Sequence, residues 1–260
     1  MRTSRTLSRR GSSAAFRVLL VALVGCGGPT QLVDTSFGSA RLAVRHGEPT
    51  EPSASRGELL LEEEGKERGV LLVPESYSPG SPAALIVLLH GAGRAPENVL
   101  PLMSDEAHAT GTLVLAPKSV ARSWDLFAVR QYGADLAFLD ATLARVFREY
   151  SVDPERITIS GFSDGATYAL SVGLSNGDLF RRIAAFSAGG VAASELQGRP
   201  AVFISHGTLD PVLPVDGGRF IVEELRDEDY VVDYREFAGV HTVPEDIARA
   251  GFDFLTGPPP

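Results

Sequence analysis

Short apolar runs alternate with amphipathic stretches from about residue 57 onward. Residues 84–89 are apolar at every position, which is typical of a parallel strand covered on both faces. Leu136, Leu139, Leu143 and Val146 have helical spacing. Further buried strands are predicted at residues 70–73, 112–115, 157–160, 183–186, 202–205 and 231–234. Strands that alternate with helical patterns predict an α/β domain with a mainly parallel sheet over residues 57–257.

The first 25 residues have a different pattern. They hold five arginines and no acidic residue, and an apolar run over residues 18–24 precedes Cys26. This run is shorter than the about 20 apolar residues of a transmembrane helix, but it suits the apolar region of a secretory signal. Leu23-Val24-Gly25-Cys26 resembles the lipobox of bacterial lipoproteins, whose cysteine is lipidated.

We therefore expect a signal peptide over residues 1–25 and an exported bacterial lipoprotein anchored to a membrane at Cys26. The other interpretation, a buried core cysteine, has no folded element around it to support it. Gly27, in place of aspartate, favours the outer membrane or the cell surface. Residues 27–52 are polar and rich in Gly, Pro, Ser and Thr, so residues 26–56 are predicted to be the lipidated cysteine and a flexible tether.

The charge balance is acidic. The chain has 24 Lys and Arg against 33 Asp and Glu, a net charge of −9, and loss of the signal peptide would take it to −14. A negative surface disfavours nucleic acid and polyanionic substrates. The single cysteine excludes an internal disulfide.

One predicted strand leads directly into a nucleophile-elbow pattern. Residues 157–160 are followed by Gly161-Phe162-Ser163-Asp164-Gly165 and then by a helical stretch. In G-x-S-x-G the serine occupies a strained turn, and the glycines let neighbouring backbone pass closely. The pattern alone occurs by chance in roughly one such chain in four. The strand before it and the helix after it identify Ser163 as the candidate nucleophile.

A serine hydroxyl needs a base to remove its proton. Of the five histidines, only His206 and His241 follow Ser163, and only His241 leaves room for an intervening acid. The chain order serine, acid, histidine therefore predicts His241 as the base. His206 directly follows a strand, which favours a structural role near the site.

The acid should follow the strand before the one that carries the histidine, where it orients the imidazole. Asp210, shortly after the strand at 202–205, has this position. Asp216 is the alternative acid, but its place beside Gly217 and Gly218 favours a helix cap.

The oxyanion of a tetrahedral intermediate needs N–H donors that are already in place. The backbone N–H of Asp164, at the start of the elbow helix, is one candidate. The other is the N–H of Ala92, with Gly91 as an alternative, in the loop after the strand at 84–89. We expect the Asp164 carboxylate to point away from the oxyanion, since the two negative charges repel.

Four motifs in this order resemble the phospholipase/carboxylesterase family of α/β-hydrolases. They are Leu89-His90-Gly91-Ala92-Gly93, the elbow, His206-Gly207 with Asp210-Pro211-Val212-Leu213-Pro214, and Gly239-Val240-His241. The resemblance covers about residues 70–256 and implies an α/β-hydrolase fold without a cap domain and hydrolysis without a cofactor. Asp164 departs from the glutamine that many members have after the nucleophile, which puts transfer of thioesterase specificity in doubt. Related polyester depolymerase and feruloyl-esterase-like proteins share the architecture.

The candidate substrate site is open, because residues 187–201 form a loop too short for a lid. Trp124 and Phe127, in the connection 118–133, either line an acyl or aryl pocket or pack this loop down.

Neither a cofactor nor a metal is expected. The sequence after Gly93 lacks the third glycine of a dinucleotide-binding fingerprint, and no pair of histidines has the spacing of a zinc-binding helix.

These observations predict a serine carboxylesterase that hydrolyses small to medium acyl or aryl esters through an acyl-enzyme, with a small-molecule or polymeric ester as its binding partner. Two rival hypotheses remain open. One is a polyester depolymerase or feruloyl-esterase-like hydrolase of extracellular polymers. The other is a non-catalytic lipoprotein that binds a ligand on a hydrolase scaffold.

Overall fold

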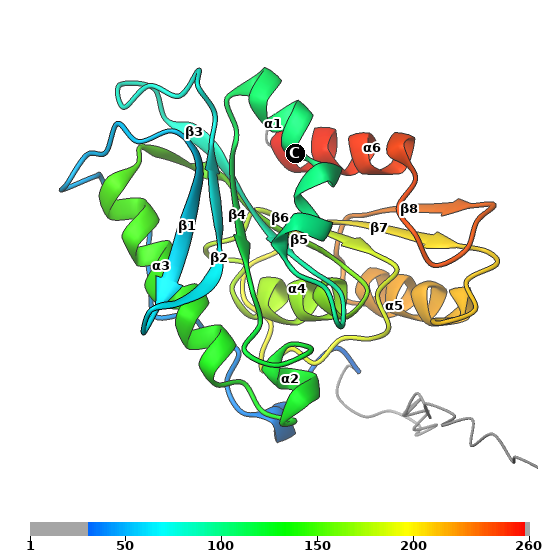
Figure 1. Ribbon diagram of the computed structural model, residues 1–260. Coiled ribbons are helices and arrows are strands. Elements are labelled where there is room, and N and C mark those ends of the chain that lie inside the picture. The colour runs from blue at the N-terminus through cyan, green and yellow to red at the C-terminus, as the bar shows by residue number, and fades with distance from the viewer. Residues whose placement is uncertain (1–30, 258–260) are drawn as a thin grey trace, which may run out of the picture.

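An eight-stranded sheet forms the centre of the computed structural model, which describes residues 31–257 (Figure 1). The strand order is β1-β2-β4-β3-β5-β6-β7-β8. Strand β2 is antiparallel to β1 and to β4, and the strands from β4 to β8 are parallel. The strands are β1 (Gly57–Glu63), β2 (Lys66–Val73), β3 (Ala83–Leu89), β4 (Leu113–Pro117), β5 (Val152–Phe162), β6 (Arg182–Phe186), β7 (Ala201–Gly207) and β8 (Val232–Phe237). The predicted α/β class and mainly parallel sheet are confirmed.

The first strand was not predicted from the sequence. Strand β1 pairs with β2 through a tight turn at Glu64 and Gly65, whose φ angles of 53° and 74° are both positive. Two successive positive φ angles suit the right-handed twist of a hairpin. The acidic run Glu62-Glu63-Glu64 lies partly in this hairpin strand, with Glu62 and Glu63 in β1.

Helices cover both faces of the sheet (Figure 1). The α-helices are α1 (Ser104–Thr110), α2 (Asp125–Ala128), α3 (Ala134–Glu149), α4 (Asp164–Ser175), α5 (Val215–Asp227) and α6 (Glu245–Thr256), and the short 3-10 helices are η1 (Thr35–Phe37), η2 (Pro96–Asn98) and η3 (Leu100–Leu102). In β3, Leu85 and Val87 pack with residues of α3, α4 and α5, whereas Ile86 and Leu88 pack with residues of α1 and α6. The unbroken apolar run of this strand thus reflects burial on both faces.

Residues 31–56, which we call the N-terminal strap, differ from the flexible tether expected for 26–56. Leu32, Ala40 and Leu42 are buried in the core. The side-chain amide of Asn176, at the end of α4, donates to the carbonyl of Ala40 (2.8 Å) and accepts from the N–H of Leu42 (2.8 Å). These contacts make the strap part of the folded unit, so the structured domain includes residues before 57.

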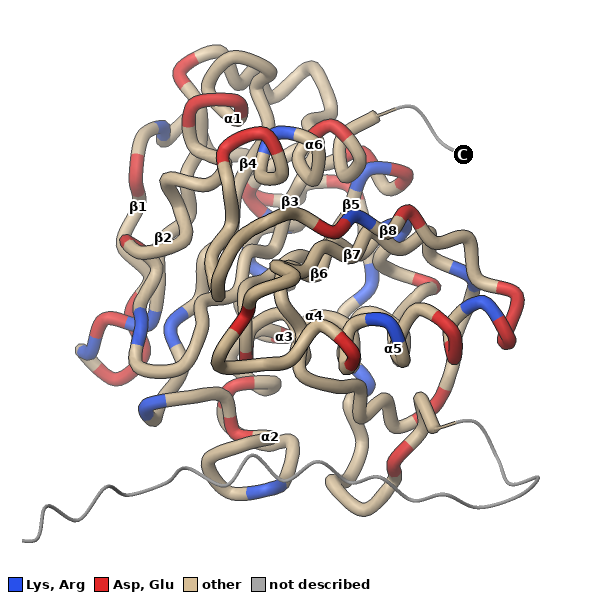
Figure 2. Tube along the Cα trace, turned by 90° about the vertical axis from the view of Figure 1, so that its right-hand side faces the viewer, with Lys and Arg blue, Asp and Glu red and all other residues tan. Residues whose placement is uncertain are grey.

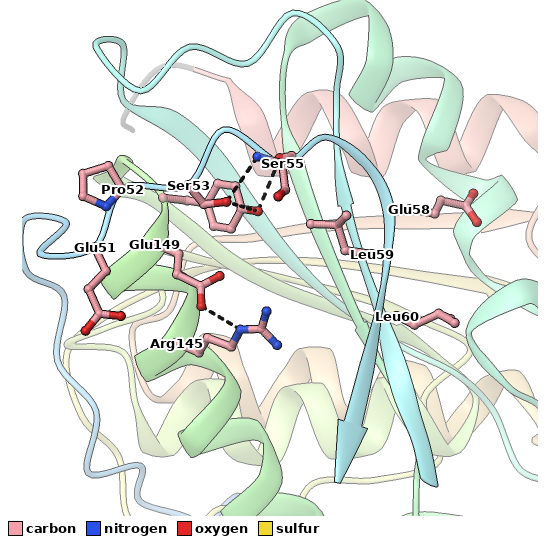
Figure 3. Close-up of a pocket in the computed structure, with 10 residues that line it drawn as sticks. Glu51, Pro52, Ser53, Ser55, Glu58, Leu59, Leu60, Arg145 and Glu149 are labelled. Atoms are coloured by element: carbon pink, nitrogen blue, oxygen red, sulfur yellow. Dashed lines mark hydrogen bonds and ion pairs between the residues drawn. The ribbon is translucent and has the colours of Figure 1, made fainter. Parts of the chain in front are cut away.

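The strap ends against α3. There Arg145 pairs with Glu149, and an open hollow of about 730 Å³ lies between them, residues 51–55 and the start of β1 (Figure 3). None of the predicted site residues lines this hollow.

No helix within residues 31–257 is long and apolar enough to cross a membrane. The predicted signal peptide and Cys26 lie outside the described residues.

Candidate active site

Four loops carry the predicted site residues, and all four follow parallel strands at their carboxyl ends. Gly91 and Ala92 follow β3, Ser163 follows β5, Asp210 follows β7 and His241 follows β8. Ligands of open α/β sheets bind outside the carboxyl ends of the strands. Strand order therefore brings together residues that are up to 150 positions apart in the chain.

Ser163 forms the sharp turn between β5 and α4, with φ 58° and ψ −121°. The flanking glycines are required sterically. A Cβ on Gly161 would lie 2.3 Å from the carbonyl oxygen of Gly165, and a Cβ on Gly165 would lie 2.3 Å from the carbonyl oxygen of Leu89. The elbow thus presses against its own helix and against β3, and this packing holds the serine in its strained conformation.

The structure brings Ser163, His241 and Asp210 into one hydrogen-bonded chain. The Oγ of Ser163 lies 2.9 Å from Nε2 of His241, and Nδ1 of His241 lies 2.6 Å from Oδ2 of Asp210. Because the carboxylate only accepts, Nδ1 carries a proton and Nε2 of the neutral ring is free to accept the serine proton. The ring of Phe162 packs on the imidazole with centroids 4.8 Å apart, which further fixes its orientation.

The carboxylate of Asp210 is fully buried and well supplied with donors. Its Oδ1 accepts the backbone N–H groups of Val212 (2.8 Å) and Leu213 (2.9 Å). Burial raises the pKa of Asp210, but these N–H bonds and the bond from His241 outweigh it, and the net pKa lies below the ordinary value. The group is therefore an anion at neutral pH and can stabilise an imidazolium.

The two alternatives raised by the sequence occupy other places. Asp216 lies in the first turn of α5, with an exposed side chain that pairs with Arg219. His206 is buried beside the acid, 3.4 Å from Oδ2 of Asp210. Its Nε2 donates to the carbonyl of Leu213 (2.8 Å), so it supports the turn that follows Asp210.

The loop after β3 lies against the nucleophile. A Cβ on Gly91 would be 3.2 Å from Cβ of Ser163, and Ala92 is exposed at this point of the loop. His90 fixes the loop from below: its Nδ1 donates to the carbonyl of Gly91 (2.8 Å), and its Nε2 accepts the N–H of Ser119 (3.1 Å). Burial lowers the pKa of His90, which favours this neutral form. The sequence placed His90 in the first of the four motifs and predicted no role for its side chain.

Asp164 begins α4, and its carboxylate is held by a neighbouring loop. The hydroxyl of Ser123 donates to Oδ2 of Asp164 at 2.5 Å. This bond joins the connection 118–133 to the residue that follows the nucleophile.

Trp124 packs this connection down and does not offer a pocket wall. Only 2% of it is exposed, its indole N–H donates to the carbonyl of His90 (2.8 Å), and its ring stacks on Tyr168. Of the two interpretations left open by the sequence, the structure therefore supports the packing role for Trp124. Phe127, in α2, is 40% exposed, so the packing role does not apply to it in the same way.

Beneath the same connection lies a buried pair of acids. The carboxylate of Asp125 accepts the hydroxyl of Tyr168 (2.9 Å) and the N–H of Asp135 (3.0 Å), and the carboxylate of Asp135 accepts the N–H groups of Val120 (2.7 Å) and Asp125 (2.8 Å). Burial raises the pKa of Asp135 to about 6. These bonds fix the backbone of the connection 118–133, which also carries Ser123, the partner of Asp164.

Among the described residues, no group of three His, Cys, Asp or Glu side chains is arranged to hold a metal ion.

The sheet order and the position of these loops define an α/β-hydrolase fold, without a cap domain in residues 31–257. Comparison with known proteins agrees. The model of the phospholipase/carboxylesterase family matches residues 137–254, which confirms the resemblance to that family.

Two curated relatives are feruloyl esterases. Probable feruloyl esterase C of Aspergillus niger is 30% identical over 163 residues, 60% of this chain and 59% of that protein. Feruloyl esterase C of Emericella nidulans is 31% identical over 157 residues, 57% of each chain. The match thus spans less than two thirds of these relatives. The crystal structure of esterase PE8 superposes with a TM-score of 0.60 at 26% identity and covers 72% of this chain and 97% of that one.

Proposed function

We propose that this protein hydrolyses carboxylic esters through an acyl-enzyme. The observation that carries the proposal is the hydrogen-bonded chain from Ser163 through His241 to Asp210. In this mechanism the Oγ of Ser163 attacks the ester carbonyl while Nε2 of His241 takes its proton, and Asp210 stabilises the imidazolium. His241 then returns the proton to the leaving alcohol, and water attacks the acyl-enzyme by the same route.

The oxyanion is assigned to the N–H groups of Ala92 and Asp164. The exposed position of Ala92 next to Gly91, and the place of Asp164 at the start of α4, support this assignment. The helix dipole adds a partial positive charge at the second donor.

The direct test is Ser163→Ala with 4-nitrophenyl butyrate as substrate. We expect turnover to fall to background, because the step that forms the acyl-enzyme is lost. A fluorophosphonate probe should label the original protein and leave the variant unlabelled. Turnover retained by the variant would place the chemistry at another residue.

Feruloyl esters are the second candidate substrate, since the curated relatives have that activity in their names. Release of ferulate from methyl ferulate and from feruloylated polysaccharide, compared with hydrolysis of 4-nitrophenyl butyrate, separates the candidates. A polyester film in the same assay tests the depolymerase hypothesis. None of the relatives supports the non-catalytic alternative, and fluorophosphonate labelling would exclude it.

Export and anchoring are proposed on the sequence alone. The arginine-rich start, the apolar run and the residues before Cys26 support lipidation there. Metabolic labelling with a clickable palmitate analogue should mark the original chain and not Cys26→Ala; equal labelling of both would reject the anchor.

A further inference from the structure

Two arginines of the described region have no partner for their guanidinium groups. Neither Arg94 nor Arg122 makes an ion pair, a hydrogen bond or a ring contact through its side chain within residues 31–257. The other arginines in that range each hold a carboxylate, a carbonyl oxygen or an aromatic ring. In an acid-rich chain, two exposed cations without a protein partner are free to attract an anionic ligand.

Both arginines are connected to Gly93, in the loop after β3. Arg94 follows Gly93 directly in the chain. The guanidinium of Arg122 packs over the same glycine, with Nε 3.2 Å and Nη2 3.6 Å from the position of a Cβ on Gly93. The N–H of Gly93 also donates to the carbonyl of Arg122 (2.6 Å). The guanidinium of Arg122 therefore lies against the residue that follows Ala92, the proposed oxyanion donor, and the exposed Arg94 is the next residue along the chain.

The backbone of Arg122 is held in place relative to the nucleophile. The next residue, Ser123, is bonded to Asp164, and Trp124 is buried and bonded to His90. Gly91 lies against Ser163, Gly93 lies against the guanidinium, and the Cα atoms of the two glycines are at most about 7.6 Å apart, so the guanidinium lies on the order of 10 Å from the nucleophile. This span fits an acyl chain of a few carbon atoms.

The surrounding charge does not neutralise the two arginines. Figure 2 shows acidic residues along α1, α5 and α6, whereas the nearby carboxylates at the site are Asp164 and Glu97, both of which act on the charge of His90. Neither forms an ion pair with Arg94 or Arg122. Asp164 is already bonded to Ser123, and both arginines are exposed to solvent.

We propose that Arg122, assisted by Arg94, is a specificity-determining residue that binds a carboxylate on the substrate. The preferred substrates are then esters whose acyl chain ends in a carboxylate, such as half-esters of short dicarboxylic acids. A guanidinium offers a planar pair of N–H donors that matches a carboxylate. This inference rests on the proposed ester hydrolysis at Ser163.

The test uses two esters that differ only in charge. Ethyl hydrogen glutarate carries the carboxylate, and ethyl glutaramate replaces it with a neutral amide of the same shape. Ethanol release by the full chain should give a higher kcat/KM for the anionic ester. Arg122→Gln should lower that kcat/KM about three- to fivefold, mainly through KM, since the ion pair is solvent-exposed. Turnover of the neutral ester should stay within about twofold.

Arg249→Gln is the matched control, because Arg249 is an exposed arginine on α6 that pairs with Glu106 on α1. It should change neither ester. Raising the salt concentration to about 0.5 M should reduce the preference of the original protein for the anion.

No preference for the anionic ester, or an equal loss on both esters in Arg122→Gln, would overturn the inference. Turnover of ethyl glutaramate or 4-nitrophenyl butyrate would show that the proposed function still stands. Absence of turnover on every ester would instead mean that the proposed function itself has failed.

Discussion

At Asp210 the local sequence supplies both the carboxylate and the backbone N–H groups that orient it. The turn that follows it returns two N–H groups to Oδ1 and leaves Oδ2 for His241. His206 holds the same turn through the carbonyl of Leu213. The loop of Asp210 thus orients its carboxylate. The carboxylate in turn accepts a hydrogen bond from Nδ1 of His241 and so fixes the tautomer of the imidazole.

We expect Asp210→Asn to lower kcat for 4-nitrophenyl butyrate by about 10³- to 10⁴-fold, because the amide would stabilise the wrong imidazole tautomer. Asp216→Asn is the control, since Asp216 is exposed and pairs only with Arg219. Steady-state kinetics of both variants give the measurement. If Asp216→Asn shows the larger loss of kcat, the assignment of the acid is wrong.

At the scale of elements, the β5–α4 junction depends on two close backbone approaches. Gly165 touches the carbonyl of Leu89 in β3, and that atom cannot move without breaking the sheet. The glycines of the elbow pattern therefore serve the packing of three elements as well as the turn.

Gly165→Ala should lower the free energy of unfolding by about 3 kcal/mol or more, since the new methyl group overlaps backbone. Gly217→Ala, in α5, meets nothing within 4 Å and should be neutral or stabilise by about 0.5–1 kcal/mol. Urea unfolding followed by circular dichroism compares them. Equal stability of the two variants would contradict the packing described for the elbow.

The acid pair under the connection 118–133 makes part of the stability depend on pH. The pKa of Asp135 is about 6 in the folded protein against 3.8 ordinarily, chiefly because the group is buried. Between these values the folded protein binds more protons than the unfolded chain, so stability falls as pH rises. The shift corresponds to about 3 kcal/mol, present below pH 3.8 and lost above about pH 6.

Asp135→Asn should remove this contribution. The unfolding free energy of the variant, relative to the original protein, should rise by about 3 kcal/mol from about pH 4 to about pH 7. Urea titrations at several pH values measure it. A constant difference across that range would show that Asp135 titrates alike in both states.

At the scale of the whole molecule, the N-terminal strap closes one side of the domain. Leu32 and Leu42 enter the core, and Arg41 pairs with Asp178 at the end of α4. Asn176 satisfies the strap backbone where it is buried.

A chain that starts at residue 50 should therefore be less stable than one that starts at residue 31, by at least about 3 kcal/mol for the two leucines alone. Asn176→Ala in the longer chain gives an independent measure, with an expected loss of about 2 kcal/mol, because it leaves buried strap groups unpaired. Thermal and urea unfolding supply both values. Equal stability of the two chain lengths would mean that the strap contributes nothing to the fold.

The sequence by itself determined the class of fold and the three residues that the structure unites. Residues 84–89 and the helical spacing of Leu136 to Val146 report burial directly, because a repeated local environment leaves a repeated pattern. Ser163 lies in a local motif, the chain order selected His241, and the position shortly after the strand at 202–205 selected Asp210 over Asp216.

Only the tertiary structure showed that the strap belongs to the folded domain, that Trp124 is buried, and that Arg94 and Arg122 have no side-chain partner within residues 31–257. The buried residues of the strap, Leu32, Ala40 and Leu42, are too few and too unevenly spaced to predict a regular element. The residues next to Trp124 in the sequence are compatible both with a side chain that lines a substrate pocket and with one that packs the loop against the core. The pairing of a charge depends on which distant residues the fold places beside it, and that information is absent from any local stretch of sequence.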